Sequence, residues 1–115
     1  MYALISDKQR LRLLANGRES LQNPDFDLAP VLKLFTPDVG VTWLLTEIDP
    51  EERDRAFGLC DLGLGFPELG WVSLWELATV CGRLGLPIKR DLSFQAEKRM
   101  RAHARDMRHT GRIGA

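Results

Sequence analysis

The fold is decided by the stretch Ala56-Phe-Gly-Leu-Cys-Asp-Leu-Gly-Leu-Gly-Phe-Pro-Glu-Leu-Gly-Trp-Val-Ser-Leu-Trp-Glu-Leu77. Its two apolar runs, residues 56–62 and 69–73, flank a glycine-rich connection, which is typical of two strands joined by a turn. Ser73 and Glu76 then have the capping-box spacing that begins a helix. The stretch therefore predicts two neighbouring strands followed by a helix that packs on their sheet.

Two further apolar runs precede this stretch, at residues 31–35 and 41–48, and the turn between them contains Gly40. Both faces of the second run are partly apolar, so we expect it to be the central strand of an antiparallel meander. Strict alternation along this strand assigns Val41, Trp43 and Leu45 to one face and Leu44 and Ile48 to the other.

Helices are expected on both sides of this meander in the sequence. Ser6 begins a capping box, and Asn16-Gly17 resembles a helix end, so we predict a first helix over residues 7–16. Residues 18–30 are interpreted as a loop, and residues 84–88 as an extended connector that contains Pro87. A last helix is predicted over residues 93–112, with 113–115 frayed. The fold class is α+β: a small, mainly antiparallel sheet of four to five strands with flanking helices.

Length and composition favour one domain of residues 1–115. The 44% apolar and 28% charged content is ordinary for a globular protein, and no apolar run approaches the roughly 20 residues of a membrane span. Residues 1–5 are too short for a signal-peptide core. Cys60 and Cys81 lie singly in apolar segments, which favours reduced, buried thiols. We therefore expect a cytoplasmic protein.

Charge is strongly segregated although the net charge is zero. Residues 1–88 contain eight Lys/Arg and thirteen Asp/Glu, whereas residues 89–115 contain eight and three. The chain therefore divides into an acidic body, residues 1–92, and the basic C-terminal helix. Such asymmetry favours contact of the helix with nucleic acid or another acidic partner, or docking of the helix on its own body.

The basic helix carries five cations along one face. A stripe of this kind could neutralise several phosphates, but it lacks aromatic residues that would stack on bases, and it could also be a solvated face. The residues that we assign to a nucleic-acid or acidic-partner contact are Lys98, Arg101, Arg105, Arg108 and Arg112.

Three carboxylates form a second candidate site. Glu47 and Asp49 are two residues apart at a strand end, and Asp61 lies on the following strand. Together they could hold Mg²⁺ or share acid–base work, although carboxylates at strand ends are more often solvated. Asp61 is surrounded by apolar residues, so we expect amides of the glycine-rich loop to satisfy it.

Aromatic residues define a third candidate site. Trp71 and Trp75, with Phe66, would form a protein-contact patch if they were exposed together. The glycine-rich loop lacks the spacing and the Lys-Ser/Thr ending of phosphate-binding loops. The two histidines, His103 and His109, fall on different helix faces and cannot form a helical zinc site. We predict no catalytic residue, metal or cofactor.

The chain resembles the bacterial domain-of-unknown-function family 2958 from about Leu4 to Phe94. The blocks that carry the resemblance are residues 56–77 above together with Pro30-Val-Leu-Lys-Leu-Phe-Thr-Pro37, Thr42-Trp-Leu-Leu-Thr-Glu-Ile-Asp-Pro50 and Gly85-Leu-Pro-Ile-Lys-Arg-Asp-Leu92. Members of this family are often found on plasmids and integrative elements. The resemblance implies no particular activity.

We therefore expect a non-catalytic accessory protein of a bacterial mobile genetic element that binds an unknown protein partner. Interference with a host defence system is one role that the mobile-element context implies. The alternative is a nucleic-acid-binding protein that uses the basic C-terminal helix. A third hypothesis is a carboxylate-dependent enzyme at Glu47, Asp49 and Asp61. The sequence leaves the oligomeric state open.

Overall fold

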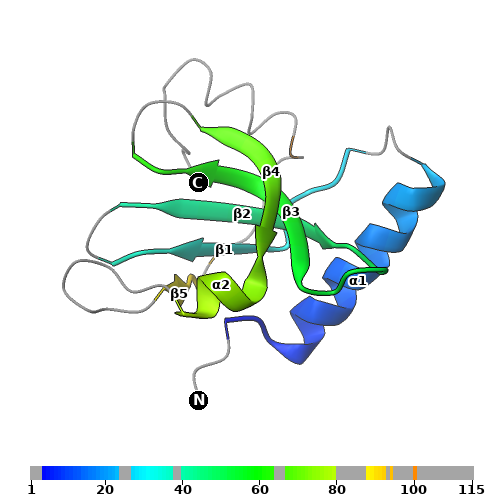
Figure 1. Ribbon diagram of the computed structural model, residues 1–115, viewed down its shortest axis with the longest axis horizontal. Coiled ribbons are helices and arrows are strands. Elements are labelled where there is room, and N and C mark those ends of the chain that lie inside the picture. Colours follow the sequence, from blue (N-terminus) through cyan, green and yellow to red (C-terminus); the bar gives the residue numbers. More distant parts are fainter. Residues whose placement is uncertain are drawn as a thin grey trace.

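A computed structural model of the chain describes residues 4–23, 27–37, 40–63, 67–79, 88–92, 94 and 100. Within these ranges, five strands form one antiparallel sheet in the order β4-β3-β2-β1-β5 (Figure 1). The elements are α1 (Asp7–Gln22), β1 (Leu32–Phe35), β2 (Thr42–Ile48), β3 (Arg55–Asp61), β4 (Glu68–Ser73), α2 (Leu74–Thr79) and β5 (Lys89–Arg90). The predicted α+β fold and the central position of β2 are confirmed.

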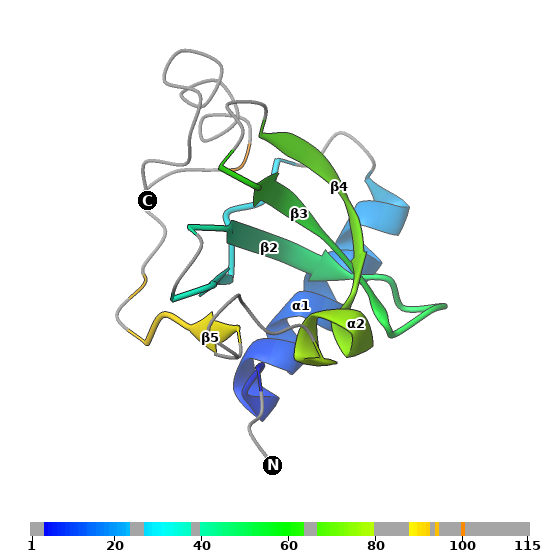
Figure 2. The same ribbon diagram turned by 60° about the vertical axis from the view of Figure 1, so that its left-hand side comes forward.

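The sheet has two different faces. On the first, which we call the helix face, buried side chains such as Leu34, Trp43 and Leu45 pack with both helices. Figure 2 shows α1 and α2 on the same side of the sheet. On the second, the open face, Leu44 and Leu59 pack with residues from near the C-terminus, as described below.

A β-bulge at Thr46 decides which side chains of β2 lie on which face. Leu45 pairs with Gly58 and Glu47 pairs with Phe57, so Thr46 is an extra residue opposite β3. One extra residue moves every later side chain to the opposite face. Glu47 therefore lies with Phe57 on the open face, and Ile48 belongs to the core of the helix face. The prediction that Ile48 shares a face with Leu44 was wrong for this reason.

The bulge is held by hydrogen bonds from two side chains. The buried Thr46 hydroxyl donates to the Phe57 carbonyl at 3.2 Å. Asn16 Nδ2, on α1, donates to the Thr46 carbonyl at 2.9 Å. A buried carbonyl without a partner would cost about 1–3 kcal/mol, so this side chain of α1 stabilises the irregular strand.

Helix α1 extends past the predicted end at Asn16-Gly17 to Gln22. Gly17 is the point where the helix backbone meets β2, since a Cβ there would lie 1.9 Å from the Ile48 carbonyl oxygen. The glycine is therefore required for close packing and does not end the helix, and the predicted loop begins after residue 22. The Ser6–Gln9 capping box at the start of α1 is confirmed.

Two side chains, Ser73 and Asp54, cap the start of α2. The Ser73 hydroxyl accepts from the Glu76 amide at 3.2 Å, as the capping-box spacing predicts. Asp54, in the β2–β3 turn, adds a cap that the sequence did not reveal: its carboxylate accepts from the Trp75 amide at 2.9 Å and from the Ser73 hydroxyl. These hydrogen bonds hold the pKa of Asp54 below its ordinary value.

The C-terminal part of the chain adds one strand to the predicted meander. β5 follows the predicted connector and pairs with β1. Of the predicted basic helix, the structure describes Phe94 and Met100, and Met100 is buried against Leu44 and Leu59 with Phe94 packed beside it. The Met100 amide also donates to the Leu28 carbonyl at 2.8 Å, which fixes this residue on the open face.

Replacing Gly17 with Ala should lower the free energy of unfolding by about 2–3 kcal/mol, because the new Cβ would overlap the Ile48 carbonyl and separate α1 from β2. Helix propensity alone predicts the opposite sign, a gain of about 1 kcal/mol. Urea denaturation followed by far-UV circular dichroism measures the difference.

Gly70→Ala is the matched control, since a Cβ at Gly70 would have no neighbour within 4 Å. The free energy of unfolding of this control should lie within about 0.5 kcal/mol of the wild-type value. Equal stability of the Gly17→Ala variant and the wild type would contradict the close packing of α1 on β2.

Candidate functional site

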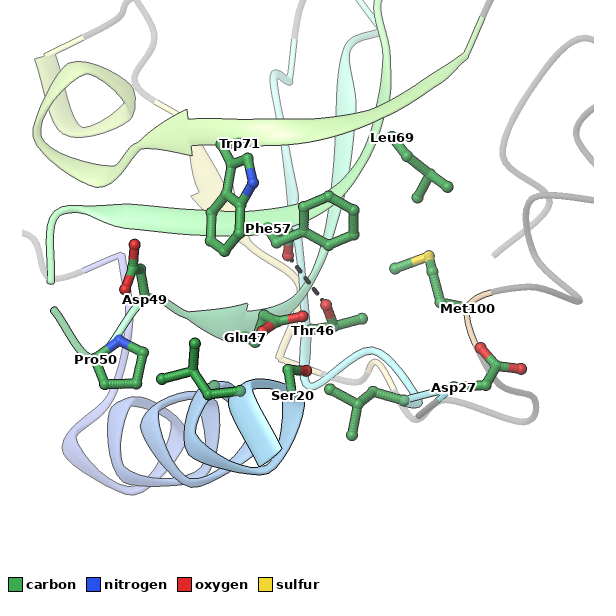
Figure 3. Close-up of a pocket in the computed structure, with 13 residues that line it drawn as sticks. Ser20, Asp27, Thr46, Glu47, Asp49, Pro50, Phe57, Leu69, Trp71 and Met100 are labelled. Carbon is green, nitrogen blue, oxygen red and sulfur yellow. Dashed lines mark hydrogen bonds between the residues drawn. The ribbon is translucent and has the colours of Figure 1, made fainter. Parts of the chain in front are cut away.

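A pocket of about 420 Å³ lies on the open face of the sheet (Figure 3). Its walls come from the last turns of α1, the segment at residues 27–28, the end of β2, and Phe57 of β3. Leu69 and Trp71 of β4 line one side, and Met100 closes an end. This volume falls within the roughly 300–1,000 Å³ of typical ligand sites.

One wall of the pocket is aromatic. Phe57 and Trp71 are cross-strand partners, and their ring centroids lie 5.2 Å apart at an interplanar angle of 61°. Such an edge-to-face pair stabilises a sheet by about 0.5–1.5 kcal/mol beyond its buried area. Trp71 is nevertheless 44% exposed and Leu69 is 46% exposed. Both therefore form an accessible rim and are not part of the core.

Carboxylates interrupt the apolar lining at Asp27, Glu47 and Asp49. Burial raises the pKa of Glu47 above its ordinary value, a hydrogen bond from Ser20 opposes this rise, and the charge of Asp49 adds to it. Asp49 has other partners: its carboxylate accepts from the Glu51 amide at 2.9 Å and lies 3.9 Å from the Arg55 guanidinium. Glu47 is therefore the carboxylate that is most affected by the apolar surroundings.

The bulge explains why Glu47 reaches this pocket. Without the extra residue at Thr46, alternation would place Glu47 on the helix face with Trp43 and Leu45. The observed register pairs it with Phe57 on the open face. Figure 3 shows Glu47 between the Phe57 and Trp71 side chains of the sheet and Ser20 of α1.

The structure brings together two of the three predicted carboxylates. Glu47 and Asp49 line the pocket, whereas Asp61 pairs with Thr42 at the other end of β2. The Asp61 carboxylate accepts from the Gly63 amide at 2.8 Å, as predicted for the glycine-rich loop, and Gly63 has the positive φ of 78° that such a turn requires. Among the described residues, no three His, Cys, Asp or Glu side chains group as metal ligands would.

Of the predicted protein-contact patch, the structure describes Trp71 and Trp75. Trp71 lies at the pocket rim, while Trp75, which is 70% exposed, lies on α2 outside the pocket lining. Phe66 lies outside the described residues, as do all five cations of the basic stripe, Lys98, Arg101, Arg105, Arg108 and Arg112. Exposure of both tryptophans agrees with a contact role, but the pocket involves only Trp71.

Cys60 is half-buried and free of disulfide bonds. Burial, followed by the charges of Asp61 and Glu68, raises the pKa of its thiol to about 11. The thiol is therefore protonated at neutral pH and is a poor nucleophile. This agrees with the structural role that the sequence indicated for Cys60.

Sequence reasoning missed Ser20, Asp27 and Leu69 as pocket residues. Ser20 was assigned to a loop because α1 was expected to end before it, and Asp27 lies in an irregular segment whose position no pattern indicates. Leu69 and Trp71 offered one usable signal, since they are two residues apart and must share a face of β4.

Comparison with known proteins identifies the family. A family model described as "Protein of unknown function (DUF2958)" matches residues 4–114, and the chain therefore belongs to this family. The searches of curated proteins and of solved structures gave no significant match. In the part of the chain that the structure describes, no helix combines the length and apolar character needed to cross a membrane.

Replacing Glu47 with Gln should change how stability depends on pH. Because the pKa of Glu47 is raised in the folded protein, the unfolded chain loses this proton first, and wild-type stability falls as pH rises from about 4.5 through the folded pKa. The Gln variant lacks this loss, so its stability relative to the wild type should increase with pH. Urea denaturation at intervals between about pH 4 and pH 8 measures the change.

Glu76→Gln on the exposed surface of α2 is the control. It removes an equal charge from a solvated position, so the difference between its free energy of unfolding and that of the wild type should not increase with pH as it does for Glu47→Gln. If the free energies of unfolding of Glu47→Gln and the wild type differed by the same amount at every pH, Glu47 would not be held in an apolar environment.

Proposed function

We propose that this protein is a non-catalytic binding module that acts through contact with another protein. The observation that carries this proposal is the rim of the pocket, where the large apolar side chains of Leu21, Leu69 and Trp71 are exposed around a concave site. Apolar side chains that gather around a hollow are typical of interaction sites, whereas single exposed ones are ordinary. Trp, in addition, is enriched among residues that dominate binding energies.

The cellular context of this proposal comes from the family resemblance. Because relatives are often carried on plasmids and integrative elements, we place the protein in the bacterial cytoplasm as an accessory protein of a mobile genetic element. Its partner would then be a host protein or another product of the element. Interference with a host defence system is one role of this kind.

Nucleic-acid binding is the second candidate, and the segregation of basic residues into the C-terminal segment favours it. The pocket itself is a poor nucleic-acid site, because Glu47 and Asp49 would repel phosphates. Fluorescence anisotropy with labelled DNA at low and physiological salt separates the two candidates. Salt-sensitive binding that is lost when Arg101, Arg105, Arg108 and Arg112 are changed to Ala would favour nucleic acid.

The enzyme hypothesis depended on three converging carboxylates. Asp61 lies opposite Thr42, at the far end of β2 from Glu47, and its carboxylate accepts a hydrogen bond from the Gly63 amide in the following turn. The arrangement that motivated acid–base or Mg²⁺ chemistry is therefore not present, and we do not propose an enzyme.

Photo-crosslinking tests the protein-binding proposal. We expect benzoylphenylalanine at position 69 to form a discrete crosslink to one host or element-encoded protein in bacterial extract. The same group at position 92 should not, although Leu92 is 84% exposed and Leu69 only 46%. Position 92 follows β5, at the opposite edge of the sheet from β4.

Competition distinguishes a specific partner from adventitious capture. Excess unlabelled wild-type protein should abolish the crosslink, and excess Trp71→Ala protein should compete at least fivefold less well, because truncation of an interface Trp commonly costs about 1 kcal/mol or more. Equal crosslinking from positions 69 and 92, or equal competition by both proteins, would count against the rim as a binding surface.

A further inference from the structure

We propose that the pocket receives an arginine side chain of the partner protein, an inference that rests on the proposed binding function. The pocket combines an aromatic wall, apolar sides and carboxylates, and each of these matches a different part of an arginine.

The charge of the pocket selects a cation. Among the described residues that line it, Asp27, Glu47 and Asp49 are acidic and none is basic. Arg55 lies beside the pocket, and its guanidinium is 3.9 Å from Asp49. Among the described residues, Ser20 supplies Glu47 with a neutral hydrogen-bond donor, in surroundings that disfavour the charge of the carboxylate. An incoming cation would remove this penalty, so charge complementarity favours a basic occupant.

The aromatic wall favours a flat cation. Guanidinium groups stack on Trp and Phe rings and present several parallel N–H donors to carboxylates, whereas an ammonium group is a compact point charge. The apolar surfaces of Leu21 and Leu69 would contact the methylene stem of the same side chain. A single arginine thus satisfies the rings, the carboxylate and the rim together.

Arg55 already makes the same two kinds of contact, with an aromatic ring and with a carboxylate, within the protein. Its guanidinium carbon lies 4.8 Å from the centre of the Trp71 ring while the group also pairs with Asp49. The side chain of Arg55 is 48% exposed and lies outside the pocket lining. The protein therefore already holds one arginine between Trp71 and a pocket carboxylate, and a second can approach Glu47 from the pocket side.

NMR titration of the ¹⁵N-labelled full chain tests the proposal. The probe is the peptide acetyl-Gly-Leu-Arg-Leu-Gly-amide, compared with the same peptide carrying citrulline, which is neutral and nearly isosteric, or lysine. The readout is the Trp71 indole N–H signal, assigned by its absence in Trp71→Phe. We expect the arginine peptide to shift this signal with at least fivefold higher affinity than citrulline and at least threefold higher affinity than lysine.

Two protein variants locate the contact. Glu47→Gln should weaken binding of the arginine peptide at least fivefold, and Glu76→Gln, which removes an equal charge on α2, should change it less than twofold. The affinity of the wild type should also rise with pH as Glu47, which shares the pocket with Asp27 and Asp49, becomes ionised. The amide spectra show directly whether each variant is folded.

Several outcomes would overturn the inference: equal binding of the arginine and citrulline peptides, no shift of the Trp71 signal, equal effects of the two variants, or a lysine peptide that binds as tightly as arginine. A crosslink from position 69 that survives while the peptide result is negative would leave the binding function intact and remove arginine as the occupant. Loss of both would remove the rim as a binding surface altogether.

Discussion

The register of β2 is the constraint on which the rest of the structure depends. Its side chains must complete a core on one face of the sheet and form a pocket on the other, and a strand with a two-residue period cannot do both with this sequence. The bulge at Thr46 resolves the conflict, because it returns Ile48 to the core and places Glu47 in the pocket. A shift by one residue would bury the carboxylate and expose the isoleucine, so the fold and the site are specified together.

Helix α1 connects this irregularity to the core. Asn16 satisfies the carbonyl of the bulged residue, and the neighbouring Gly17 lets the helix backbone approach the end of β2. Neither residue is a good helix former, and their combined propensity cost is about 1–2 kcal/mol. Close packing and one satisfied buried carbonyl are worth at least as much. The last turns of α1 then extend beyond β2 and supply Ser20 and Leu21 to the pocket.

The predictable parts of the structure are those that short segments determine. Strands β1 to β4, both helix starts and the central position of β2 follow from apolar runs and capping residues within about ten positions of one another. The bulge, the continuation of α1 through Gly17 and the separation of Asp61 from Glu47 follow from contacts between distant elements. Asp61 illustrates the difference: it lies on the neighbouring strand, yet its register opposite Thr42 puts it about 17 Å along β2 from Glu47. For the same reason sequence patterns identified Glu47, Asp49 and Trp71 as candidates but not the pocket that they share.

Glu47 is the point at which the protein departs from the arrangement that would be most stable. A neutral side chain of similar size at this position would avoid the cost of holding a carboxylate against Phe57 and Trp71, and that cost is visible in its raised pKa. Departures of this kind concentrate at sites where a partner compensates for them. A cation that paired with Glu47 would lower its pKa again, so proton and cation would compete for the same carboxylate. The binding energy of such a partner would then include the relief of a penalty that the free protein already carries.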